Sequence, residues 1–371
     1  MRRWDIFCAV VDNFGDIGTC WRLALQLATE HQVSVRLWID NLTSFAILCP
    51  QALSDVDIQF VDSIEIRHWT VPFPDVDVAD VVIEAFACNI PTVYIAKMAQ
   101  SQPAPVWINL EYLSAEAWVE DCHLSQSPQP RLPLTKTFFF PGFTAKTGGL
   151  LCEEGLLAAR AAFDQDAANN FWSRRSVPPA ADELRVSLFC YENPALADLL
   201  ETLADDSLPV RLLVCAGTAA RLVADWFGHA LVPGTVMTRK MLTVQGLPFL
   251  PQADYDRLLW SCDVNFVRGE DSFVRAQWAQ QPFVWQIYPQ SENAHSAKLD
   301  AFLARFLGEN ADLQSVWDCW HAWNGAGDIR TAWSKFVADR QRIQQHGKVW
   351  ASQLDRTGNL ANNLVRFVCG Q

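Results

Sequence analysis

Apolar runs and helical patterns alternate along the first half of the chain. The runs that predict buried strands are 4–11, 33–39, 64–69, 78–83, 106–110 and 137–140. Helical periodicity lies between several of them, most clearly at 18–31 and 114–122. This alternation predicts βαβ units and a mainly parallel sheet.

A second alternation follows a linker. A long helical pattern at 154–175 is followed by 176–183, whose paired prolines and missing periodicity predict a connection between domains. Beyond it, strands are predicted at 185–190, 210–215, 242–249, 264–267 and 283–287, with helices at 194–203, 218–226, 255–262 and 271–280. From 294 the pattern is helical to the end, including a long amphipathic run at 329–352.

These patterns predict an α/β protein of two Rossmann-like domains facing a cleft. We expect an N-terminal domain at 1–175 and a C-terminal domain at 184–350. The remaining helical segment, 351–371, could pack back on the N-terminal domain.

Composition narrows the function. The net charge of −13 argues against a nucleic-acid partner bound through its phosphates, and against an anionic membrane surface. The 11 cysteines include no C-x-x-C pair, and several lie inside apolar runs, which is typical of a reducing compartment. With neither a signal-peptide pattern nor a membrane-spanning apolar run in the sequence, we expect a cytoplasmic protein.

Several common motifs are missing. Neither domain has G-x-G-x-x-G after its first strand, and the chain has no G-x-x-x-x-G-K-[ST] and no H-E-x-x-H. A dinucleotide oxidoreductase and a P-loop nucleotidase are therefore disfavoured. Because the seven histidines are scattered singly, we expect neither a structural nor a catalytic metal.

The first candidate site is the turn Val10–Gly18, between the first strand and a helix expected to start near Gly18. It contains two glycines and the carboxylates of Asp12 and Asp16. In open α/β sheets such a turn, at the carboxyl end of a strand, is where ligands bind. The alternative is that its Asp and Asn residues only cap the helix.

The second candidate is Arg268–Ser272, where a buried strand runs through Gly269 into a helix. A helix start holds phosphate through its unpaired N–H groups, and Arg268 or Arg275 could add positive charge. Two acidic residues would repel that anion, so Glu270 requires another role, such as holding sugar hydroxyls. The alternative is an ordinary helix with acidic residues in its first turn.

Aromatic residues follow two predicted strands of the second half. A binding site for a nucleobase needs a stacking face and amide-type hydrogen bonds. Phe249 is of the type that supplies the face, and Gln252 of the type that supplies the hydrogen bonds. Phe189 and Tyr191 end a neighbouring strand. An ordinary core can contain the same residue types.

Four sequence blocks together resemble the EarP family, the protein-arginine rhamnosyltransferases that modify translation elongation factor P. They are D-N-F-G-D-I-G near the start, N-L-E-Y-L-S-A-E at 109–116, P-G-F-T-x-x-T-G-G-L at 141–150 and R-G-E-D-S-F-V-R-A-Q-W-A at 268–279. The resemblance covers essentially the whole chain. It implies a GT-B glycosyltransferase fold, an inverting mechanism without metal or other cofactor, and dTDP-β-L-rhamnose as the donor. The implied acceptor is the guanidinium of one arginine in elongation factor P.

The resemblance also implies residue roles. Asp12 and Asp16 correspond to the first-domain carboxylates, and Glu270 to the second-domain catalytic glutamate. The residues expected to bind the donor are Asn13, Phe14, Gly15, Phe189, Tyr191, Phe249, Gln252, Arg268, Gly269, Asp271 and Ser272.

The chemistry agrees with these roles. A guanidinium binds carboxylates in a fork, which explains two aspartates in one turn. We expect Asp16 to act as the base, because it lies just before the predicted helix, where its ionised form is favoured, and Asp12 to be the second half of the clamp. We expect the 109–116 segment to help dock the folded acceptor. Two other functions remain as alternatives to a rhamnosyltransferase. One is a nucleotide-sugar epimerase of the same fold, and the other is a non-catalytic, nucleotide-sensing chaperone of a translation factor.

Overall fold

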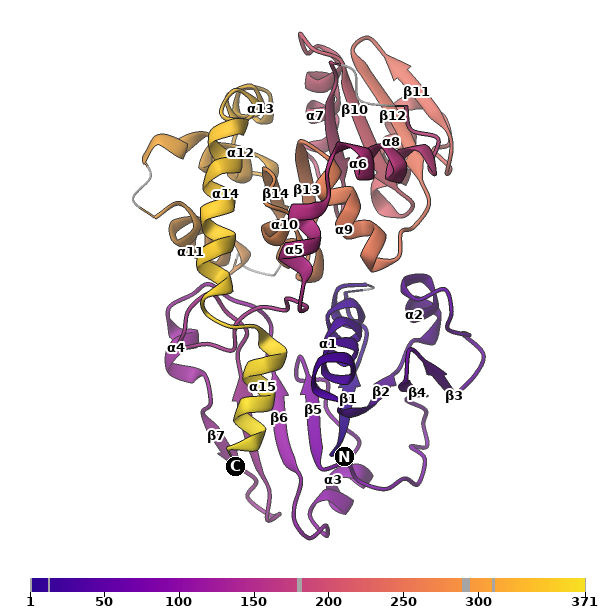
Figure 1. Cartoon of the computed structure of the whole chain (residues 1–371), viewed down its shortest axis with the longest axis vertical. Coiled ribbons are helices and arrows are strands. Elements are labelled where there is room, and N and C mark those ends of the chain that lie inside the picture. The colour runs from indigo at the N-terminus through magenta and orange to yellow at the C-terminus, as the bar shows by residue number, and fades with distance from the viewer. Residues whose placement is uncertain (1, 13, 179–181, 289–293, 309–310, 371) are drawn as a thin grey trace. The chain divides into compact units, whose positions relative to one another are not determined.

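The strongest apolar runs form two sheets, one in each of two compact units (Figure 1). The computed structural model describes residues 2–12, 14–178, 182–288, 294–308 and 311–370, so the predicted donor residue Asn13 lies outside the described residues. Unit 1 comprises Met1–Glu154 and Leu354–Gln371, and unit 2 comprises Gly155–Gln353.

Unit 1 is built on an eight-stranded sheet of order β3-β4-β2-β1-β5-β6-β8-β7. Its strands are β1 Arg3–Cys8, β2 Ser34–Ile39, β3 Ile58–Val61, β4 Ile64–His68, β5 Val81–Ala85, β6 Val106–Leu110, β7 Gln126–Pro128 and β8 Thr135–Phe139. Its helices are α1 Gly15–His31, α2 Leu42–Leu48, α3 Thr92–Met98, α4 Trp118–Cys122 and α15 Leu360–Cys369. The inner strands β4, β2, β1, β5, β6 and β8 pair in parallel, as the buried apolar runs predict.

Unit 2 has a six-stranded sheet of order β11-β12-β10-β9-β13-β14. Its strands are β9 Leu184–Leu188, β10 Val210–Cys215, β11 Val236–Arg239, β12 Leu242–Leu247, β13 Val264–Arg268 and β14 Phe283–Gln286. Its helices are α5 Leu156–Ala162, α6 Gln165–Ser173, α7 Leu196–Ala204, α8 Thr218–Phe227, α9 Gln252–Ser261, α10 Asp271–Ala279, α11 Ala294–Leu307, α12 Gln314–Trp323, α13 Ile329–Ala338 and α14 Arg340–Asp355, whose last two residues belong to unit 1. All pairings except β11 with β12 are parallel.

Three strands were not predicted: β3, β7 and β11. Each is short, lies at a sheet edge and pairs antiparallel. Since one side of such a strand meets solvent, its apolar signal is weak.

The boundary between the units differs from the one expected at the proline linker. Helices α5 and α6 belong to unit 2, because Phe171 and Trp172 pack in a core cluster with Leu213, Leu247 and Leu258. The predicted single helix at 154–175 is broken at Asp164, whose carboxylate accepts the N–H of Ala167 at the start of α6.

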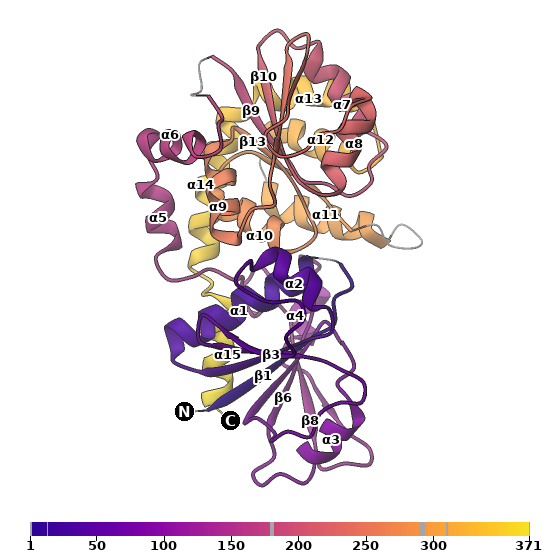
Figure 2. The ribbon, with the colours of Figure 1, turned by 90° about the vertical axis from the view of Figure 1, so that its right-hand side faces the viewer.

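The C-terminal helix belongs to unit 1. Figures 1 and 2 show α15 against the sheet of this unit, where it contacts α1. Leu150 pairs with Asn359 just before α15 begins, and the N–H of Leu360 reaches the carbonyl of Leu150 at 2.9 Å. The predicted run at 329–352 forms two helices, α13 and α14, because it is interrupted at Asp339. Among the described residues, no helix is both long and apolar enough to cross a bilayer.

Candidate active site

The turn after β1 is organised by Asp16. Helix α1 begins at Gly15 rather than near Gly18, so Asp16 lies in its first turn, with only 2% of the residue exposed. Its Oδ2 accepts the backbone N–H groups of Val11 and Asp12, at 2.9 and 2.8 Å. Asp16 therefore closes the turn that precedes α1 instead of acting as the N-cap of the helix.

Tyr112 completes the environment of Asp16. Its hydroxyl donates to Asp16 Oδ1 at 3.1 Å, and its ring stacks on Phe86 with the centroids 4.4 Å apart. The three residues follow β1, β5 and β6, which are adjacent parallel strands, so their carboxyl ends meet at one edge of the sheet. Within the predicted docking segment 109–116, Asn109, Ser114 and Ala115 are buried, whereas Tyr112 is exposed.

Asp12 and Gly15 fit closely together. A Cβ added at Gly15 would lie 2.7 Å from Asp12 Oδ2, so any side chain at 15 would displace this carboxylate. The N–H of Gly15 also donates to the carbonyl of Asp12 at 2.6 Å. Asp12 is partly buried, and the neighbouring Phe14 occupies the N-cap position without a side-chain cap. Position 15 therefore requires glycine because a side chain has no room beside the Asp12 carboxylate.

The second predicted constellation lies at the carboxyl end of β13. Gly269 has a φ of 60°, which lets the chain turn from β13 into α10. Ser272 Oγ accepts the N–H of Arg268 at 3.0 Å and donates to its carbonyl. Glu270 is the N-cap residue, its side chain does not cap the helix, and Asp271 lies in the first turn.

Arg275 does not supply charge to this helix start. It is 2% exposed and binds Asp256 of α9 through two hydrogen bonds of 2.9 and 2.7 Å. The suggestion that Arg275 might bind an anion is therefore wrong, because a buried carboxylate already pairs its guanidinium.

Arg268 has a different environment. Its guanidinium carbon lies 4.5 Å from the Phe189 ring centroid and 4.3 Å from that of Tyr191. Strands β9 and β13 are adjacent and parallel, which brings Phe189 and Arg268 to the same sheet edge. The sequence suggested aromatic walls for a nucleobase here, but it did not reveal that two of them hold an arginine.

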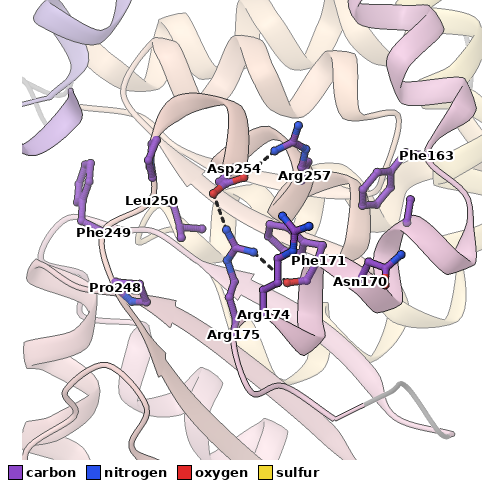
Figure 3. A pocket seen from close by; sticks show the side chains of 12 residues that line it. Phe163, Asn170, Phe171, Arg174, Arg175, Pro248, Phe249, Leu250, Asp254 and Arg257 are labelled. Carbon is purple, nitrogen blue, oxygen red and sulfur yellow. Dashed lines mark hydrogen bonds and ion pairs between the residues drawn. The ribbon is translucent and has the colours of Figure 1, made fainter. Parts of the chain in front are cut away.

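Phe249 follows a different strand of the unit 2 sheet. It follows β12, which β10 separates from β9, and it lines a pocket of about 550 Å³ with residues of α6 (Figure 3). Asp254, on the wall of this pocket, binds Arg175 at 2.5 Å and Arg257 at 2.7 Å. Gln252 begins α9 but is not a lining residue.

Tyr255 was not predicted from the sequence as a site residue. Its ring packs edge-on to Phe189, with the centroids 5.9 Å apart. Burial raises the pKa of its hydroxyl well above the ordinary value, and the charge of Asp271 adds to this effect. Tyr255 therefore stays a protonated hydroxyl beside the start of α10. The only signal for it in the sequence was its position three residues after Gln252 on one helix face.

Across the ranges that the structure describes, no three His, Cys, Asp or Glu side chains lie close enough together to hold a metal ion. Each of the eleven cysteines has a free thiol.

The chain is similar to proteins of one family over almost its whole length. Residues 4–369 match the family model described as "Elongation-Factor P (EF-P) rhamnosyltransferase EarP". The chain is 49% identical over 370 residues to a protein-arginine rhamnosyltransferase of Pseudomonas putida, with 98% of each chain covered. It is 47% identical to the protein of the same name from Pseudomonas aeruginosa, with 99% of each covered.

Solved structures agree with this assignment. One described as the structural basis for EarP-mediated arginine glycosylation of translation elongation factor EF-P matches with a TM-score of 0.69 and 35% identity, covering all of both chains. MurG of Acinetobacter baumannii matches with a TM-score of 0.51 at 11% identity, over all of both chains, which shows the GT-B type of fold alone. This chain therefore belongs to the EarP family of protein-arginine rhamnosyltransferases.

Proposed function

We propose that this chain transfers L-rhamnose from dTDP-β-L-rhamnose to the guanidinium of one arginine in elongation factor P, with inversion. Family membership over residues 4–369 is the observation that carries the proposal. The donor, the acceptor protein and the stereochemistry are the parts that the experiment must test. With a translation factor as acceptor, we place the activity in the cytoplasm.

The reaction forms one bond and breaks one. A guanidinium nitrogen attacks the anomeric carbon while the bond from that carbon to the diphosphate oxygen breaks, releasing dTDP and giving an α-linked product. The attacking nitrogen loses a proton, which a carboxylate accepts. An isolated arginine has a pKa above 12, so the group must be oriented and its proton accepted during attack.

In this proposal unit 1 provides the acceptor-side groups. Asp16 accepts the proton, and Asp12 binds a second N–H of the guanidinium in a fork. The support for Asp16 is its fixed orientation: three hydrogen bonds hold its carboxylate, so no rearrangement is needed at the moment of transfer.

Unit 2 provides the donor side. The backbone N–H groups at the start of α10, including those of Asp271 and Ser272, take the diphosphate, and Arg268 stabilises the negative charge that develops on it. Glu270 holds the sugar, while Phe249 and Gln252 bind thymine. No metal is assigned, since fixed dipoles and one arginine can replace it.

Intact-mass analysis of elongation factor P tests the proposal. Incubation with enzyme and dTDP-β-L-rhamnose should add one deoxyhexose, placed on arginine by tandem mass spectrometry, and NMR should show an α anomer. A changed free sugar with unmodified acceptor would indicate an epimerase. Tight binding without chemistry would indicate a chaperone.

A further inference from the structure

Tyr112 connects the aspartate turn of unit 1 to an exposed aromatic surface. Its hydroxyl is 3.1 Å from Asp16 Oδ1, and its ring is stacked on Phe86 at an interplanar angle of 16°. Although Phe86 covers one face, 42% of Tyr112 is exposed. The exposed part of the ring is therefore a surface bordering the Asp16 carboxylate.

Phe86 is a fixed support for this ring. It follows β5 directly and has a φ of 55°, and the next residue, Ala87, has a φ of 52°. Left-handed conformations are uncommon outside glycine and concentrate at functional sites. The N–H of Phe86 donates to the carbonyl of Leu110 at 2.7 Å, which ties the end of β5 to the end of β6.

The carboxylate retains one acceptor position. A carboxylate has about four lone-pair sites. At Asp16, Oδ2 accepts two backbone N–H groups and Oδ1 accepts the Tyr112 hydroxyl. Oδ1 can thus accept one further donor, on the oxygen next to the Tyr112 ring.

We propose that Tyr112 binds the acceptor guanidinium on the exposed surface of its ring and positions Asp16 through its hydroxyl. This inference rests on the proposed function. A guanidinium is planar, weakly hydrated and rich in edge N–H donors, so it can stack on a ring while one N–H reaches Oδ1. A lysine ammonium has no plane to stack. The site accordingly selects arginine over lysine.

Two substitutions separate the roles of the ring and the hydroxyl. Tyr112→Leu removes the aromatic face and should raise the acceptor KM about 10-fold, equivalent to about 1.4 kcal/mol. Tyr112→Phe keeps the face and should leave KM within about 2-fold, while kcat falls about 10-fold because Asp16 is less well oriented. Rates are measured by intact mass of elongation factor P, and dTDP affinity, which should stay at the wild-type value, by calorimetry.

Phe60→Leu is the matched control. Phe60 lies on β3, at the far edge of the same sheet, and is 72% exposed. This variant removes an exposed ring of unit 1 away from the aspartates, and its KM and kcat should match those of the wild type.

The outcomes distinguish this inference from the proposed function. If the wild type does not modify the acceptor, the proposed function fails first. If the wild type is active and Tyr112→Leu keeps its KM, or both Tyr112 variants lose activity alike, Tyr112 has only a structural role. Should Tyr112→Leu lose its fold by circular dichroism, Tyr112→Met, with a flexible side chain and no ring, takes its place.

Discussion

Replacing Asp16 by Asn tests whether this carboxylate is the base. Asp16 is buried and accepts three hydrogen bonds, two from the backbone and one from Tyr112. An Asn side chain has nearly the same shape. Its oxygen can take the N–H groups of Val11 and Asp12, and its amide can donate to the Tyr112 oxygen instead.

The structural cost of this change is limited. All three hydrogen bonds of this side chain can persist. The stability that is lost comes from replacing a charged oxygen acceptor by a neutral one, which costs about 1 kcal/mol for each hydrogen bond from the backbone. We therefore expect Asp16→Asn to lower the free energy of unfolding of unit 1 by about 2 kcal/mol. Loss of a general base should lower transfer by at least ~10²-fold, about 2.7 kcal/mol in the barrier.

Asp40→Asn is the matched control. Asp40 Oδ1 accepts the N–H of Val10 at 2.9 Å, so this side chain also supports the β1–α1 turn. Urea unfolding, dTDP calorimetry and transfer rates are measured for both variants. Asp40→Asn should lose a little stability and keep its transfer rate. Near-wild-type transfer by Asp16→Asn would refute the role of base, and equal losses in both variants would attribute the effect to turn geometry.

Four further predictions follow from the donor side, the acceptor and pH. Phe249→Ala should weaken dTDP binding by about 1–3 kcal/mol, and unchanged affinity by calorimetry would make Phe249 a packing residue. EDTA should leave transfer intact, whereas a loss restored by Mg²⁺ would assign a metal. A short arginine peptide should be a poor substrate compared with folded elongation factor P, because remote contacts position the nitrogen; equal efficiency would contradict this. Burial lowers the pKa of His123 to about 4, and its Nδ1 accepts the N–H of Phe140. Because the folded-state pKa lies below the ordinary 6.5, unit 1 should lose stability as pH falls from about 6.5 to about 4. Thermal unfolding of His123→Asn should lack this slope, and an unchanged slope would exclude His123 as its source.

The inner strands could be predicted because each is a buried apolar run. The predicted segment 106–110 coincides with β6, and 210–215 with β10. Helix breaks were harder to find, because apolar periodicity continues through them. At Asp164 the break depends on one side chain capping the next helix, a local competition that a pattern over many residues does not resolve.

The candidate residues could be found from the sequence, but not all of their partners. Asp16 and Tyr112 are 96 positions apart and meet only because β1, β5 and β6 are neighbours. Strand order likewise puts β10 between β12, which Phe249 follows, and β9, which Phe189 follows. Arg275 and Arg268 looked equivalent in the sequence. In the structure Asp256 pairs with Arg275, whereas aromatic rings flank Arg268.

Two buried carboxylates that look alike in the sequence differ in their hydrogen-bond partners. Asp5 lies in β1 and Asp16 in the first turn of α1, and both are buried. Asp5 accepts four donors, two from Arg36 and one each from Trp38 and Tyr94. These four donors, together with its complete burial (0% exposed), let Asp5 stabilise the sheet but leave none of its surface accessible to a substrate. Asp16 accepts three, and its remaining position lies on the oxygen that Tyr112 holds. A carboxylate fixed by the fold but not saturated by it can receive a proton without reorganising, which is the property that base catalysis needs.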